Sequence, residues 1–376
     1  MNKITRNYDI ISKEQDLEHI YSFKQFPVFM GCVNQPQSED IVSDMNWYIS
    51  KSSGMIQLDP LLPLDVVYQS EHSPGTTGKA WMDHHAAFAK FINQYTPTTV
   101  YEIGGSHGIL SQCCYDDNDS IKWTIIEPNP IPVENLKASV IKGFFTKDTV
   151  LPDNLDMIVH SHVLEHIYEP NEFFESLENI KPGVKMCFSI PNLKLYLERR
   201  YTNALNFEHT FYCSEEYVEW WLKKYNFKLK ERYYYSDFSI FYCCVKTDTD
   251  EDIDTPSLYE ENKKLFQGYL DHHIDLITDI NQNIRNTTSL VYLFGAHVFS
   301  QFLLSFGLDR SRIACILDNS TLKQGKRLYG TDLFVNSPQV LKDIESPIVI
   351  LRCGVFNDEI KREILENINN TTIFLE

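Results

Sequence analysis

Several features that would assign this chain to common functional classes are missing from its sequence. No run of about 18 apolar residues is long enough to span a membrane, and the first residues lack the apolar core of a signal peptide. The nine cysteines form no C-x-x-C pair and suggest no disulfide framework. We therefore expect a cytoplasmic protein with reduced thiols and no membrane partner.

Positive charge is also scarce. Lys and Arg number 34 against 52 Asp and Glu, which gives a formal net charge of -18. The acidic residues are spread along the chain and do not form a tail. Such a surface repels phosphate backbones, so neither DNA nor RNA is an expected partner. We expect the substrate to be a small molecule.

The most informative segment that is present runs from Val100 to Leu110. It begins in a predicted strand, passes Glu102 and then contains a cluster of glycines. These are Gly104, Gly105 and Gly108. Glycines at such a turn permit positive φ angles and let a ligand approach the backbone, while the helix that follows offers free N–H groups. A second apolar segment ends in Glu127, where a carboxylate can hold the hydroxyls of a ribose.

The glycine spacing differs from the G-x-G-x-x-G of a pyrophosphate site, because after Gly104 the next glycines stand at 105 and 108. The pattern is typical of a site for a nucleoside without phosphates, and a ligand-free turn is the alternative. We predict S-adenosylmethionine as the cofactor, with Glu102 at the amino end of its methionine part. Further cofactor contacts are expected at the ends of the second and fourth strands. They are Pro128, His160 and Ser161.

Three histidines, His160, His162 and His166, follow the predicted strand over residues 156–160. Ligands of open α/β sheets bind beyond the carboxyl ends of the strands, so this segment is expected to border the cofactor through its backbone. A metal site is the alternative. Metal ligands must converge, usually with a carboxylate or thiolate, and only His162 and His166 have helical i, i+4 spacing. The sequence therefore predicts no metal ion.

Two polar segments are candidates for the acceptor side of the site. Glu208 and His209 stand side by side in a loop, and such a pair can accept and orient a proton or be a surface pair without a role. Residues 68–78 precede the first helix of the predicted domain and form either a lid or a solvated loop. The residues expected to contact the substrate come from these segments and from the end of the fifth strand. They are Tyr68, His72, Thr76, Asn192 and Asn206.

The chain divides into three predicted parts. Residues 1–80 show no sustained periodicity and are expected to form an irregular module packed over the next domain. Residues 81–247 alternate between strand and helix signals, which predicts an open α/β sheet with an antiparallel edge. After an acidic linker at 247–254, residues 255–376 predict a long helix and a smaller α/β unit with three strands.

Taken together, these motifs resemble the class I S-adenosylmethionine-dependent methyltransferases. The resemblance rests on E-I-G-G-S-H-G, on the acidic end of strand two, on H-S-H-V-L-E-H-I-Y-E-P and on S-I-P-N. The segments at 69–77, 206–214 and 318–331 are similar to the three-part sugar C-methyltransferases. That resemblance implies a Rossmann-like methyltransferase sheet, a C-terminal half of a dinucleotide fold and a nucleotide-linked keto-sugar as acceptor.

The resemblance also implies roles for individual residues. Glu208 and His209 would abstract the proton, with His166 as a further polar contributor. The adenine ring would pack at Phe144 and Phe145. The family usually binds zinc through N-terminal cysteines, whereas here Cys32 stands alone and no zinc is expected. Basic residues that could meet a diphosphate are Lys323, Lys326 and Arg327.

The expected function is methyl transfer from S-adenosylmethionine to carbon or oxygen of a sugar or nucleotide-linked sugar. One alternative is a non-catalytic scaffold that keeps the methyltransferase fold, because the motif around Asn206 and Phe207 departs from the family pattern. Another is a dehydrogenase that uses Gly295 and Asp318, although a single half-fold cannot hold both nucleotides of its cofactor. The oligomeric state is left open by the sequence.

Overall fold

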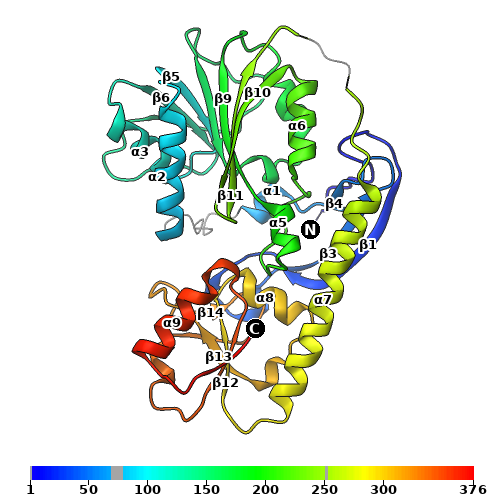
Figure 1. The fold of residues 1–376 in the computed structure, drawn as a ribbon, viewed down its shortest axis with the longest axis vertical. Helices are drawn as coiled ribbons and strands as arrows, with labels where there is room; N and C mark the ends of the chain where they lie inside the picture. Colours follow the sequence, from blue (N-terminus) through cyan, green and yellow to red (C-terminus); the bar gives the residue numbers. More distant parts are fainter. Residues whose placement is uncertain (1, 69–78, 250–252) are drawn as a thin grey trace.

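The computed structural model describes residues 2–68, 79–249 and 253–376 (Figure 1). Sheets of seven, five and three strands account for most of the strands in the part described. The seven-stranded sheet and the five-stranded sheet lie at opposite ends of the molecule, and the long helix α7 (Tyr259–Arg285) runs along its side. Two α/β units are therefore joined by a helix and an N-terminal module.

The seven-stranded sheet has the order β10-β11-β9-β8-β5-β6-β7. The five neighbouring strands β9, β8, β5, β6 and β7 are parallel. Strands β11 and β10 form the antiparallel edge. The predicted α/β class is confirmed, although the sequence missed β7. The strands are β5 (Thr99–Ile103), β6 (Lys122–Glu127), β7 (Ser139–Lys142), β8 (Met157–Ser161), β9 (Lys185–Pro191), β10 (Phe227–Tyr235) and β11 (Ser239–Lys246).

Helices cover both faces of this sheet, which is why β5, β8 and β9 are buried almost along their whole length. Apolar residues of α2 and α3 pack on one face, around Val100 and Trp123. The other face packs against α4 and α6 through Phe174 and Trp221. The helices of this unit are α2 (Lys79–Asn93), α3 (Ile109–Asp117), α4 (Pro170–Glu175), α5 (Leu193–Glu198) and α6 (Glu215–Lys224).

The N-terminal module is a three-stranded antiparallel sheet, so the prediction of an irregular segment was wrong. Its strands are β1 (Leu17–Pro27), β3 (Val42–Ser50) and β4 (Ile56–Leu58). The pairing of β1 with β3 shifts register between His19 and Tyr21 and again between Phe23 and Phe26. Each shift interrupts the alternation of buried and exposed residues, which is the signal by which a strand is recognised in a sequence.

The module packs against the C-terminal unit and also against the unit of the seven-stranded sheet, where Gln57 pairs with Phe211. β3 contacts α7, and β1 contacts α8 (Val298–Ser305). The short strands β2 (Cys32–Val33) and β14 (Arg327–Leu328) pair with each other. Arg327 also forms a buried two-pronged ion pair with Asp40, at 2.6 and 2.8 Å. Arg327 is therefore occupied and does not serve as a diphosphate contact, contrary to the expectation from the sequence.

The C-terminal unit contains five parallel strands in the order β15-β13-β12-β16-β17, where the sequence predicted three. The two missed strands lie at the edges and are only two and three residues long. The strands are β12 (Val291–Phe294), β13 (Ile313–Leu317), β15 (Val335–Asn336), β16 (Ile348–Leu351) and β17 (Ile373–Leu375), and α9 (Asn357–Asn367) precedes the last of them.

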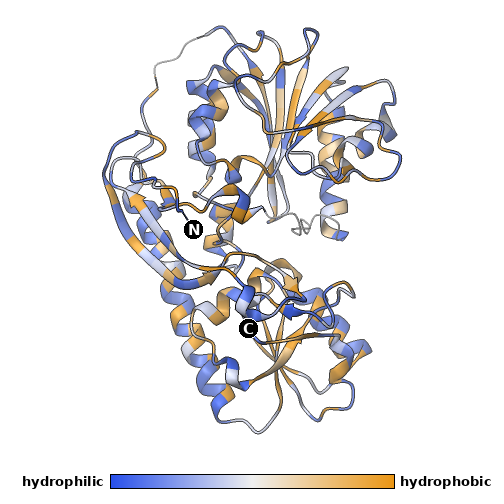
Figure 2. Cartoon of the chain, turned by 180° about the vertical axis from the view of Figure 1, so that it is seen from behind, coloured by the Kyte–Doolittle hydropathy of each residue, from blue (hydrophilic) through white to orange (hydrophobic). Residues whose placement is uncertain are grey.

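Hydrophobic residues concentrate on the central strands of both α/β units, while the outer surfaces of the helices are hydrophilic (Figure 2). Each unit thus has the two-sided burial expected of a mostly parallel sheet. Among the described residues, no helix is both long and apolar enough to cross a membrane.

Candidate active site

The candidate site lies where the strand order of the large sheet reverses, between β5 and β8. Loops leaving the carboxyl ends of two such strands go to opposite faces of the sheet and open a crevice for a ligand. Here the first loop is the glycine turn after β5, and the second contains residues 162–166. The two loops are in contact, because Val163 lies against the backbone of Gly104.

The glycine turn depends on its glycines for two reasons. Gly104 and Gly108 have φ angles of +72° and +75°, which side chains rarely tolerate. A Cβ at Gly104 would lie 2.7 Å from Cγ2 of Val163, and one at Gly108 would lie 2.7 Å from Cδ1 of Leu136. The turn can therefore lie close to both loops that flank it, the one with Val163 and the one with Leu136.

Glu102 lies beneath this turn and is 2 % exposed. Its Oε2 accepts a hydrogen bond of 2.7 Å from the indole Nε1 of Trp123 on the neighbouring strand. Burial raises the pKa of Glu102 to about 7, and the Trp123 hydrogen bond opposes that rise. Its carboxylate thus has a partner within the protein, and contact with the amino end of a cofactor stays a prediction.

Glu127 ends β6 and holds the turn from the other side. Its Oε2 accepts from the backbone N–H of Ser106 at 3.1 Å, and its Oε1 accepts from that of Asn129 at 2.9 Å. A carboxylate oxygen has a second lone pair, so these bonds orient Glu127 and leave capacity for a hydroxyl. Pro128 follows directly in the loop.

The end of β8 separates core residues from site residues. The His160 side chain is fully buried, stacked on Phe188 at 4.7 Å between ring centroids. Ser161 shares a hydrogen bond of 2.8 Å with the hydroxyl of Ser189 on β9. A side-chain contact from His160 to a ligand would require its core to open, so only the expected backbone contact stays as a prediction.

Beyond β8, four titratable side chains meet: Glu165, His166, Glu208 and His209. One ligand atom from each of Glu165, His166 and His209 lies within 4.8 Å of the others. The Nδ1 of His166 lies 3.9 Å from Oε2 of Glu208, and its ring is 5.1 Å from that of His209. Tyr68 joins them through a 2.7 Å hydrogen bond between its hydroxyl and Nδ1 of His166.

Backbone contacts bring these residues together from segments far apart in the chain. The amide oxygen of Asn206 accepts from the N–H groups of Glu208 and His209, each at 2.8 Å, and so shapes their loop. The N–H of Thr210 then donates to the carbonyl of Glu165 at 3.2 Å. The buried guanidinium of Arg6 fastens the same loop by donating to the carbonyl of Thr210.

The charges of the cluster follow from its burial. Desolvation lowers the pKa of His209 to about 3 and lowers that of His166, so both imidazoles are neutral at pH 7. Desolvation raises the pKa of Glu208 to about 7, and the charge of Glu165 adds to the rise. Burial would also raise the pKa of Glu165, but the neighbouring histidines reverse that effect and lower it to about 2.

The other predicted residues have different positions. Asn192 and Asn206 are buried, and their side-chain oxygens accept backbone N–H groups, so both support loops and neither presents that oxygen to a substrate. Phe145 packs against Phe173, whereas Phe144 is 60 % exposed. His72 and Thr76 lie outside the described residues.

Sequence reasoning missed Glu165 and Arg6 as parts of this site. Glu165 stands between His162 and His166, which the sequence analysis did consider. Its carboxylate is the kind of partner that a histidine metal site needs, and it was overlooked. Arg6 gave no signal, because a single arginine near the N-terminus has no pattern that links it to residue 210. Only the fold reveals that both serve the same crevice.

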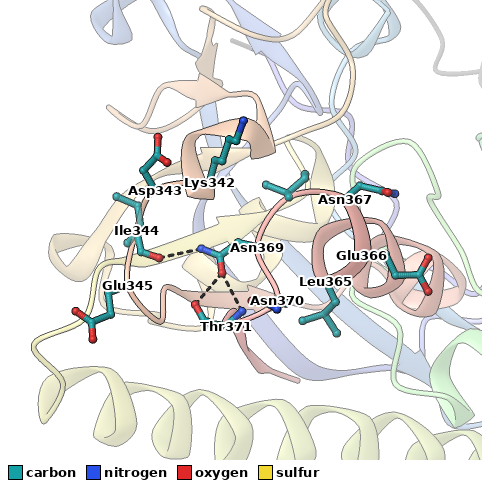
Figure 3. A pocket seen from close by; sticks show the side chains of 11 residues that line it. Lys342, Asp343, Ile344, Glu345, Leu365, Glu366, Asn367, Asn369, Asn370 and Thr371 are labelled. Carbon is teal, nitrogen blue, oxygen red and sulfur yellow. Dashed lines mark hydrogen bonds between the residues drawn. The ribbon is translucent and has the colours of Figure 1, made fainter.

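A hollow of about 570 Å³ lies in the C-terminal unit (Figure 3). Its walls are the loops before β16 and β17, at the amino ends of those strands. Asn369 fills its polar centre, donating to the carbonyls of Leu341 and Ile344 and accepting from Thr371. Ligands of such sheets bind at the carboxyl ends, so this hollow does not compete with the crevice.

Comparison with known proteins supports the reading of the large sheet. Residues 77–231 match the family model of the methyltransferase domain. The enzyme class and the cofactor S-adenosylmethionine, both predicted from the sequence, agree with this match, whereas the acceptor is not defined by it. None of the curated proteins compared with the chain matches its sequence.

Solved structures of methyltransferases also match parts of the chain. An S-adenosylmethionine-dependent methyltransferase from Aquifex aeolicus is 16 % identical, with 43 % of this chain and 89 % of that chain covered and a TM-score of 0.35. The 1,6-didemethyltoxoflavin-N1-methyltransferase of Burkholderia thailandensis, solved with its substrate and S-adenosylhomocysteine, is 13 % identical. That match covers 54 % of this chain and 98 % of the other, with a TM-score of 0.40.

A third structure is the N,N-8-amino-8-demethyl-D-riboflavin dimethyltransferase from Streptomyces davawensis. It is 18 % identical, with 45 % of this chain and 56 % of that chain covered and a TM-score of 0.36. An acceptor is named for two of these three proteins, and neither is carried over to this chain.

Proposed function

We propose that this chain transfers the methyl group of S-adenosylmethionine to an oxygen or carbon atom of a sugar or nucleotide-linked sugar. The observation that carries the proposal is the cluster of Glu165, His166, Glu208 and His209 at the switch point. The cluster adjoins the glycine turn, since Val163, which precedes it, lies against Gly104. Cofactor and acceptor would therefore meet across one loop contact.

The cluster favours an acceptor that must lose a proton. A hydroxyl, or a carbon beside a ketone, gives up a proton as it gains the methyl group, whereas a free amine already has a lone pair. In the proposed step the acceptor's O–H or C–H bond breaks and a bond to the methyl carbon forms. The CH₃–S⁺ bond breaks, its electron pair returns to sulfur, and the proton passes to the carboxylate of Glu208.

Glu208 is assigned as the proton acceptor because of its place in the cluster. Its side chain is 20 % exposed, whereas that of Glu165 has no exposed surface. A substrate entering the crevice can therefore reach Glu208 but not displace Glu165. His209, neutral at pH 7, would orient the acceptor, and His166, whose Nδ1 lies 3.9 Å from Oε2 of Glu208, would border the base.

Support for a sugar or nucleotide-linked acceptor comes from the sequence resemblance and from the C-terminal unit. In each α/β unit, a carboxylate at the end of one strand accepts a hydrogen bond from the turn that follows the neighbouring strand. Glu127 accepts from the N–H of Ser106 at 3.1 Å, and Asp318 accepts from that of Ala296 at 2.9 Å. This hydrogen bond, which both units share, agrees with a C-terminal unit that descends from a nucleotide-binding half-fold.

Two assays test the proposal. The first is calorimetric titration of the chain with S-adenosylhomocysteine, and the second follows radiolabelled methyl transfer to a panel of free sugars and nucleotide-linked keto-sugars. Transfer to one of these acceptors that is lost in Glu208→Gln is the expected result. Binding without transfer to any sugar, together with transfer to an amine or another class of acceptor, would refute the sugar assignment. Absence of cofactor binding would instead favour a scaffold.

A further inference from the structure

Glu165 is an unexplained charge in this site. Its side chain is fully buried, and the closest ion-pair partner of either carboxylate oxygen among the described residues is Nδ1 of His162, 3.3 Å from Oε1 and poorly aligned for a hydrogen bond. Within the same part, only His162 and His166 approach it as ion-pair partners, and no lysine or arginine does so. An isolated buried carboxylate is costly, so a positive charge is expected beside it.

The contacts of Ser239 orient the closest histidine, His162. The Ser239 hydroxyl donates its single proton to the carbonyl of Ile190 at 3.0 Å. The same hydroxyl lies 3.2 Å from Nε2 of His84 and 3.0 Å from Nε2 of His162. With its Nε2 held there, His162 turns its Nδ1 toward Glu165, 3.3 Å from Oε1.

Two further ring nitrogens surround the same carboxylate. The Nε2 of His166 lies 3.8 Å from Oε1 of Glu165, and the Nδ1 of His209 is buried without a partner among the described residues. A neutral imidazole has an N–H on one ring nitrogen and a lone pair on the other, so these nitrogens can meet a carboxylate either through a proton or as fellow ligands of a cation. The arrangement is thus a set of donors that converge on a small space.

We propose that Glu165, His166 and His209 bind a divalent transition-metal ion, such as zinc or ferrous iron. Two imidazoles and one carboxylate form a recurring three-ligand set that leaves other coordination positions open, and imidazole favours these ions over magnesium or calcium. The ligand atoms lie within 4.8 Å of one another, and bonds of about 2.0–2.2 Å require only a modest contraction. This proposal replaces the prediction of no metal.

The residues around the ligands fit this role. The hydroxyl of Tyr68 binds Nδ1 of His166, which fixes the ring with Nε2 toward Glu165. Such an outer partner orients metal-bound histidines in general. The hydrogen bond between the N–H of Thr210 and the carbonyl of Glu165 keeps His209 next to the other two ligands.

The chemical use of the ion rests on the proposed function. A cation at these ligands would attract the acceptor's oxygen, either a hydroxyl or the carbonyl beside a reacting carbon, and would stabilise the negative charge that develops on it. The proton would still pass to Glu208, and the methyl would still leave sulfur with the bond's electron pair remaining on sulfur. The metal site therefore implies an oxygen atom at or next to the methylated position.

The test begins with the full chain stripped by a chelator and then titrated with Co²⁺, whose visible spectrum reports nitrogen and oxygen ligation, followed by competition with Zn²⁺. About one equivalent is expected to bind. Glu165→Gln and His209→Ala should each weaken binding by at least about 100-fold, because even outer partners of metal ligands contribute 10–100-fold. His19→Ala, on the exposed surface of β1, is the matched control and should bind like the parent chain.

Calorimetry with S-adenosylhomocysteine on the same samples separates this proposal from the proposed function. Cofactor binding without any Co²⁺ or Zn²⁺ binding would overturn the metal site alone. Metal binding without cofactor binding would support the metal site and refute the methyltransferase function. Metal binding that survives in both folded variants would assign the ion elsewhere and overturn the proposal.

Discussion

The backbone N–H of Thr210 donates to the carbonyl oxygen of Glu165 at 3.2 Å, although the two residues are far apart in the sequence. This single bond joins the loop after α5 to the loop after β8. It places His209 beside His166, with 5.1 Å between their ring centroids. The candidate acid–base site therefore depends on how one loop is anchored.

Arg6 is the main anchor of that loop, and its loss should destabilise the fold. The buried guanidinium donates to the carbonyls of Thr210, Leu58 and Tyr168. Arg6→Met would leave these acceptors buried and unpaired, which we expect to lower the free energy of unfolding by about 3 kcal/mol or more. Urea denaturation measures this change, with the exposed Lys3→Met as control. A loss below about 1 kcal/mol would show that the anchor is elsewhere.

Gly104→Ala should damage both stability and cofactor binding. The new Cβ would sit at a φ of +72° and 2.7 Å from Val163, so we expect a loss of about 2 kcal/mol in unfolding free energy. Gly268→Ala provides the contrast, because that helical glycine has no atom within 4 Å of the added Cβ. It should stabilise the chain by about 0.5–1 kcal/mol. Equal effects of the two substitutions in thermal denaturation would contradict the described turn.

Glu102 should make the stability of the fold pH-dependent. Its pKa rises from 4.5 to about 7 on folding, so the folded state binds more protons between these pH values. The free energy of unfolding should therefore fall as pH rises from about 4.5 through 7, by on the order of 3 kcal/mol in total. Glu102→Gln keeps an acceptor for Trp123 and should lack this component. A parent-minus-variant difference that is flat from pH 4.5 to 8 would refute the shift.

Glu208→Gln should separate catalysis from binding. The variant keeps the shape of the side chain but cannot accept a proton, so kcat should fall by about 10²–10⁴-fold. The affinity for S-adenosylhomocysteine should be unchanged, because Glu208 lies on the acceptor side of the loop contact. Steady-state kinetics and calorimetry measure the two effects. An unchanged kcat would remove Glu208 from the proton transfer.

The sequence predicted the shape of the glycine turn and the position of Glu127 better than the cluster of Glu165, His166, Glu208 and His209. A short stretch of sequence encodes the turn from Glu102 to Gly108, because a strand pattern is followed by glycines that the packing requires. Glu127 likewise follows directly on a strand pattern. The acid–base cluster is different, because Glu165 and His209 approach one another only through Thr210 and Arg6. Such contacts between distant segments leave no periodic signal in the sequence.

The same distinction explains the errors in the fold. Long helices such as α7 have clear periodicity and buried strands such as β8 form continuous apolar runs, and both were predicted within a few residues. The N-terminal strand β1 was missed because its two register shifts disturb the alternation of side chains. Strands β15 and β17 were missed because two or three residues are too few to show a pattern.

The central claim is that the crevice between β5 and β8 binds S-adenosylmethionine through the glycine turn and Glu127. The most direct measurement is calorimetric titration of the full chain, Glu127→Ala and the exposed control Glu363→Ala with S-adenosylhomocysteine. We expect binding by the parent and control and a loss of at least about tenfold in affinity for Glu127→Ala, with all three folded. No binding by the folded parent chain, or equal binding by Glu127→Ala, would contradict the account.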